Sequence, residues 1–104
     1  MTIIRACSKT FSVTPAEDPT HYSEIIATIA QDGVNLVNKT LSDMEISGAD
    51  IIVRLSQEET KQFKAGVRAW LQMRFYAGEY DAPGSPEWPV DVMPVLDDQI
   101  LGGE

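Results

Sequence analysis

The chain has 104 residues, of which 43% are hydrophobic and 23% charged, and its 16 acidic and 8 basic side chains give a net charge of −8. These values are typical of one globular domain rather than a disordered or fibrous chain. The negative charge disfavours nucleic acid and anionic membranes as partners, because both require clustered Lys and Arg.

The N-terminal residues lack the charged segment and long apolar run of a signal peptide. No stretch approaches the roughly 20 apolar residues that cross a bilayer. We therefore expect the protein to be made and folded in a cytoplasm.

The first half of the chain alternates apolar and polar residues, which predicts half-buried β-strands. The expected strands cover residues 3–6, 9–14, 22–31 and 34–41. Two prolines break structure between Thr14 and Thr20. Asp32-Gly33 predicts a tight hairpin between the last two of these strands, because glycine readily adopts the positive φ of such turns.

A short strand around Met44–Ile46, a turn at Ser47–Asp50 and a strand at Ile51–Leu55 follow. The alternation of apolar and polar residues then ends at Ser56, and Glu59 lies three residues after it. This spacing predicts a capping box, in which each residue binds the other's backbone N–H. We expect a helix from about Ser56 to Lys64, with Phe63 in the core.

The clearest strand pattern covers Val67–Tyr76. One face is predicted to be core, and it carries Val67, Ala69, Leu71, Met73 and Phe75. The other face mixes aromatics with Arg and Gln, and we predict that Trp70, Arg74 and Tyr76 offer a surface for protein contacts.

The residues 77–86 are expected to form a loop, and Trp88–Val95 a last strand. Pro89 and Pro94 lack amide donors, so this strand is predicted to lie at an edge or to leave the sheet at its ends. The residues 96–101 fit either a helical turn or a docking tail, and 102–104 are expected to be a flexible tail.

These elements predict one domain over residues 1–101, with two antiparallel sheets packed as a sandwich. The alternative is a small α+β domain with one sheet and one helix. Trp88 is expected to lie mostly in the core, and Trp70 at its edge or at an interface.

No pattern for catalysis, a metal or a cofactor is found, since the chain lacks a phosphate-binding glycine loop, a nucleophile elbow and paired cysteines. We expect the single Cys7 to be a buried structural thiol and the single His21 to be a surface or loop-packing residue. The sequence thus favours a non-enzymatic protein.

The segment Ile51–Thr60, IIVRLSQEET, resembles a strand and helix start found in small phage and prophage structural proteins. The start at Ile3-Ile4-Arg5 with the strand at Lys9–Val13, and the strand Ile25–Gln31 with its polar turn, resemble the same group. These proteins are similar to the N-terminal immunoglobulin-like domain of phage baseplate upper proteins.

The resemblance implies an immunoglobulin-like antiparallel β-sandwich of about seven strands with one short helix. It also implies a structural or adaptor role in a phage tail or baseplate, as a virion component. The partners would be other tail or baseplate proteins, with a homo-oligomer as a further option. The alternative is a free-standing bacterial immunoglobulin-like binding module of the adhesin type.

Free sheet edges are ready sites for strand addition by a partner. The prolines should blunt pairing along the last strand, so the N-terminal edge at Ile3, Ile4 and Arg5 is the better candidate. We predict two contact surfaces, this edge and the outward residues Trp70, Arg74 and Tyr76.

Overall fold

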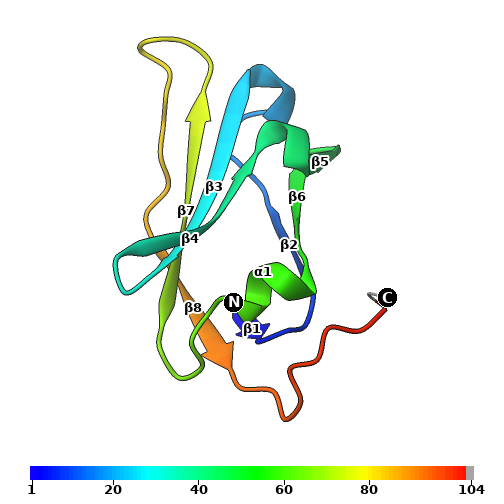
Figure 1. The fold of residues 1–104 in the computed structure, drawn as a ribbon. Helices are drawn as coiled ribbons and strands as arrows, with labels where there is room; N and C mark the ends of the chain where they lie inside the picture. The colour runs from blue at the N-terminus through cyan, green and yellow to red at the C-terminus, as the bar shows by residue number, and fades with distance from the viewer. Residues whose placement is uncertain (103–104) are drawn as a thin grey trace.

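A computed structural model describes residues 1–102 of the chain. Two β-sheets form two layers, and a short helix lies near β1 at one end of them (Figure 1). The elements are β1 (Thr2–Ile4), β2 (Lys9–Val13), η1 (Pro19–His21), β3 (Glu24–Gln31), β4 (Val34–Thr40), η2 (Leu41–Asp43), β5 (Met44–Ser47), β6 (Asp50–Leu55), α1 (Gln57–Lys61), β7 (Ala69–Tyr76) and β8 (Trp88–Met93).

The larger sheet has five strands in the order β1-β8-β7-β3-β4, and the smaller has three in the order β2-β6-β5. The predicted two-sheet sandwich is confirmed, and the single-sheet alternative is wrong. One pair departs from the expected antiparallel arrangement, because β1 runs parallel to β8 with Ile3 opposite Val92. This pairing joins the two ends of the chain, so no local pattern indicates it.

The hairpin between β3 and β4 forms as predicted. Asp32 and Gly33 have φ values of 53° and 75°, and Gln31 pairs with Val34 across them. Positive φ at both central residues gives the turn a twist that matches the flanking strands.

The predicted capping box at the start of α1 is confirmed. The Ser56 hydroxyl accepts from the Glu59 backbone N–H at 3.2 Å, and the Glu59 carboxylate accepts from the Ser56 N–H at 2.8 Å. Lys39 of β4 donates to the same carboxylate at 2.9 Å, which ties the helix to the larger sheet. The helix ends at Lys61, earlier than predicted, and Phe63 is buried as expected.

The prediction that Cys7 is buried is wrong, because its side chain is exposed. The chain turns sharply after β1, where Ala6 adopts a φ of 63° and Cys7 N–H donates to Ile4 O at 3.1 Å. This turn places the Ala6 methyl in the core and directs Cys7 outward.

The last strand is not an edge of the sheet, because β1 pairs with it on the side away from β7. It ends at Met93, so Pro94 lies just beyond it. The segment after it forms no helical turn as far as residue 102. It docks instead, since Gln57 binds both the N–H and the C=O of Leu101, at 2.9 and 3.0 Å. The predicted flexible tail lies mostly outside the described residues.

The core fills the space between the sheets with side chains from both. Its buried members are Ile3, Tyr22, Ile25, Ala27, Ile29, Val37, Ile51, Val53, Leu55, Phe63, Ala69, Leu71, Met73, Val90 and Val92. Two polar residues, Gln31 and Thr60, are buried, and Gln31 closes the core at the end of β3. Its amide donates to Lys64 O and Val67 O at 2.8 Å each, and its carbonyl accepts from Lys64 N–H at 2.7 Å.

Replacing Gln31 with methionine keeps the volume but removes all three hydrogen bonds. The partly buried backbone groups of Lys64 and Val67 then lose these partners, which should lower the free energy of unfolding by about 1–3 kcal/mol. Urea melts of parent and variant measure this, with the exposed Gln99→Met as the control. Equal midpoints for Gln31→Met and the parent would contradict this role.

Substituting Ser56 with alanine removes the hydroxyl that caps α1. The expected loss is about 0.5–2 kcal/mol of unfolding free energy, because the Glu59 N–H loses its acceptor. Ser42→Ala at the exposed η2 serves as a comparison for the same chemical change outside α1. A midpoint that moves equally in both variants would show that the cap does not stabilise the fold.

Candidate protein-binding surfaces

The outer face of the larger sheet carries the aromatic residues that the alternation in β7 predicted to point outward. Trp70 and Tyr76 are each 41% exposed, and Arg74 between them is exposed. They stand opposite Ala30, Ile26 and Glu24 on β3. We define the outer face as Trp70, Gln72, Arg74 and Tyr76 of β7 with Ile26 and Ala30 of β3.

Arg74 lies at the rim of a shallow hollow in this outer face. The hollow has a volume of about 140 Å³, and Glu24, Ile26 and Tyr76 line it with Arg74. The Arg74 guanidinium forms no salt bridge with any residue in 1–102, whereas Arg5, Arg54 and Arg68 each have an acidic partner. The outer face therefore offers a cation, unpaired within these residues, on the same side of β7 as two aromatic side chains.

The three N-terminal residues predicted to form the second surface differ in their surroundings. Ile3 is fully buried and belongs to the core, so its side chain is not available to a partner. Arg5 is engaged internally, with its Nε donating to Phe63 O at 2.9 Å and a guanidinium nitrogen 3.4 Å from Asp98 Oδ2. Only Ile4 presents an exposed side chain, although β1 does form an edge of the larger sheet.

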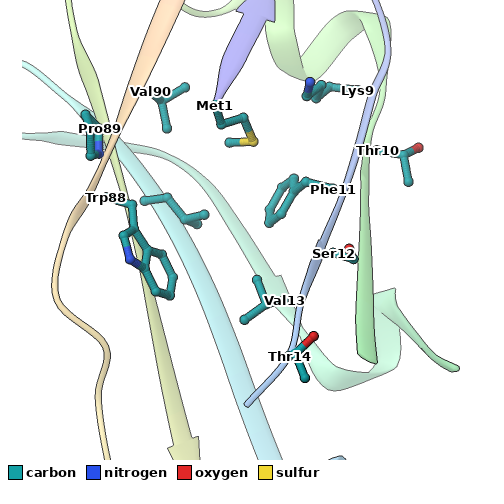
Figure 2. Close-up of a pocket in the computed structure, with 11 residues that line it drawn as sticks. Met1, Lys9, Thr10, Phe11, Ser12, Val13, Thr14, Trp88, Pro89 and Val90 are labelled. Atoms are coloured by element: carbon teal, nitrogen blue, oxygen red, sulfur yellow. The ribbon is translucent and has the colours of Figure 1, made fainter. Parts of the chain in front are cut away.

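A groove that the sequence did not reveal opens between the two sheets. It has a volume of about 640 Å³ and lies between β2 and the start of β8. Figure 2 shows Phe11 and Val13 pointing from β2 toward Trp88, while Thr10 and Ser12 point away. Trp88 is 36% exposed here, so the expectation that it lies mostly in the core is wrong. No local sequence pattern indicates the groove, because it depends on β2 being an end strand of the smaller sheet.

His21 holds the long loop after β7 against η1. Its Nε2 lies 2.7 Å from Asp81 Oδ2 and 3.9 Å from Glu17. The hydrogen bond to Asp81 raises the pKa of His21 above 6.5, with smaller contributions from the nearby carboxylates. The surface position expected for this residue is confirmed by its exposed side chain.

Within residues 1–102, no group of three or more His, Cys, Asp or Glu side chains is placed to hold a metal ion. The same residues include no helix with the length and apolar character needed to cross a membrane.

The solved structures that are similar to this chain include two strand-swapped dimers of the mouse leukocyte-associated immunoglobulin-like receptor 1. The extracellular domain matches with a TM-score of 0.52 and 10% identity, over 88% of this chain and 85% of the other. The immunoglobulin-like domain matches with a TM-score of 0.54 and 11% identity, over 89% and 86%. No family model and no curated protein matches. At this identity the likeness shows the fold alone, which is an immunoglobulin-like β-sandwich.

The contact of His21 with Asp81 should depend on pH. A raised pKa means that the contact stabilises the fold fully below pH 6.5 and that this stabilisation is lost as the pH rises through the folded-state pKa. Asp81→Asn should therefore lower the pKa of His21, measured by NMR titration of its ring protons. Asp91→Asn, which alters a carboxylate paired with Arg68, is the control. An unchanged pKa of His21 in Asp81→Asn would contradict the conclusion that Asp81 raises this pKa.

Proposed function

We propose that this chain is a non-enzymatic structural or adaptor protein of a phage or phage-like tail or baseplate, and that it binds partner proteins through the outer face. The observation that carries the binding role is that Trp70, Arg74 and Tyr76 are exposed on one side of β7, and that Arg74 has no ion pair within residues 1–102. The phage assignment is supported by the sequence resemblance of Ile51–Thr60.

The chemistry of the outer face favours protein contacts. Tryptophan, tyrosine and arginine are the residues most enriched where binding energy concentrates. Here they project from a strand that is hydrogen-bonded on both sides, so their backbone is already ordered. Binding then costs little conformational entropy, since each aromatic side chain has only two χ angles to fix.

The charge of the protein limits which partner surfaces can bind to the outer face. The protein carries a net charge of −8, so most of its surface repels acidic proteins. Arg74 is an exception, because its guanidinium has no acidic partner within residues 1–102, and a partner carboxylate beside it would gain a charge-assisted hydrogen bond. The fitting partner surface is therefore apolar, with an acidic side chain at its centre and basic residues around it.

The test is co-expression with the proteins encoded beside this chain, followed by size-exclusion chromatography with light scattering. We expect a stable complex with a tail or baseplate protein, or a homo-oligomer. Arg74→Glu and Trp70→Ala should each weaken it by about 30-fold, which corresponds to about 2 kcal/mol. Arg54→Glu, an equal charge change on the smaller sheet, should leave it intact.

A different outcome distinguishes the alternative. If the chain elutes as a monomer beside every neighbouring protein, the tail role is wrong and a free-standing immunoglobulin-like binding module is the better account. If a complex forms but tolerates Arg74→Glu and Trp70→Ala, the outer face is not the contact surface.

A further inference from the structure

The outer edge of β2 ends the smaller sheet, and the hydrogen-bond pattern of that sheet identifies which groups are free. The hairpin between β5 and β6 has a two-residue loop, with Ser47 opposite Asp50. Such a loop is closed by a hydrogen-bonded pair, and bonded and non-bonded pairs alternate from there along the strands. Ile51 and Val53 therefore direct their backbone groups away from β5 and toward β2.

The same alternation assigns the groups of β2. Phe11 and Val13 stand opposite Val53 and Ile51, so they bond to β6. Thr10 and Ser12 then direct their N–H and C=O groups to the outer edge. No backbone or side-chain group within residues 1–102 hydrogen-bonds to them there. The edge is an open template for one more strand.

The groove lies directly beside this edge and is apolar. Phe11 and Val13 form one wall, and Trp88 and Val90 form the other (Figure 2). β1 pairs with β8 only from Asp91 onward, and Met1, just before β1, lines the groove between Val90 and Phe11. Pro89 has no N–H to donate, so β8 is a poor template and β2 is the better one.

We propose that an extended segment of a different protein adds to β2 as a further strand of the smaller sheet. About five residues would match the edge, and every second side chain would be apolar and would enter the groove between Phe11 and Trp88. The segment would carry Lys or Arg at the end that lies near Thr14 and Trp88, because Lys9 lines the other end of the groove. This site is separate from the outer face and does not rest on the phage assignment.

Two observations favour a different protein over a second copy of this chain. Every strand described between residues 1 and 102 already has a place in one of the two sheets, and Gln57 fixes the segment after β8 at Leu101. A second copy would also bring a net charge of −8 against another −8. Asp50, which accepts a hydrogen bond from Thr14, and Glu87, which precedes Trp88, add to the preference for a basic residue at that end of the segment.

The test uses the full chain labelled with ¹⁵N and the synthetic peptide acetyl-Lys-Val-Thr-Val-Thr-Val-Lys-amide. On titration, the amides of Thr10 and Ser12 should gain at least about tenfold protection from hydrogen exchange, and the Trp88 indole signal should shift. The same peptide with Glu in place of both Lys should bind more weakly, with the difference largest at low salt.

Matched variants separate strand addition from other binding. Ser12→Pro removes one outward N–H and should weaken the peptide by about tenfold or more, whereas Ser12→Ala keeps that N–H and should bind normally. Arg74→Glu should bind the peptide normally, even where it abolishes partner binding at the outer face.

Two peptides, N-methylated at either the valines or the threonines, make the test independent of how Ser12→Pro folds. The N–H groups of alternate residues in a strand point to opposite sides, so in one of the two peptides the methyl groups face β2. That peptide should not bind. The proposal is overturned if both bind normally, if protection appears on β1 or β4 instead of β2, or if no protection appears at millimolar peptide. It is also overturned if light scattering of the chain alone shows a dimer that Ser12→Pro dissociates.

Discussion

The carboxamide of Gln31 determines where the chain crosses from the smaller sheet to the larger one. After α1 the backbone must travel between layers, and Gln31 holds it by three hydrogen bonds to Lys64 and Val67. Because the Gln31 side chain is buried, its carboxamide depends on these bonds, and losing them would leave that polar group unpaired.

This clamp also fixes the register of β7, and with it the outer face. Val67 is held in place two residues before Ala69, which pairs with Gln31 itself. Side chains alternate along a strand, so a slip of one residue would turn Trp70 and Arg74 into the core and expose Leu71 and Met73. The outer face therefore depends on a polar contact at the far end of the strand.

The sequence predicts the features that nearby residues determine, and these include most of the strands. Short sequence patterns predict the Asp32-Gly33 turn and the capping box of Ser56 and Glu59, each of which spans four residues or fewer. The alternation of apolar and polar residues predicts the two faces of β7. Cys7 differs because the positive φ at Ala6 is rare outside glycine and carries no sequence signal. The parallel pairing of β1, the partners of Gln31 and the exposure of Trp88 require contacts between distant segments. Of the residues predicted for the candidate interfaces, those on β7 are exposed on one face, while Ile3 and Arg5 serve the fold.

The two proposed contact surfaces, the outer face and the β2 edge, would recognise partners by different physics, which matters if the protein is the adaptor proposed above. The outer face offers side chains, whose area and charge select one complementary surface. The β2 edge offers backbone groups, which accept any extended segment whose alternate side chains fit between Phe11 and Trp88. A strand added to β2 would lie beside the smaller sheet, whereas Trp70, Arg74 and Tyr76 point away from the sandwich on the larger one. Both surfaces can therefore be occupied at once, and simultaneous occupancy is what separates an adaptor, which connects two proteins, from a module that binds only one.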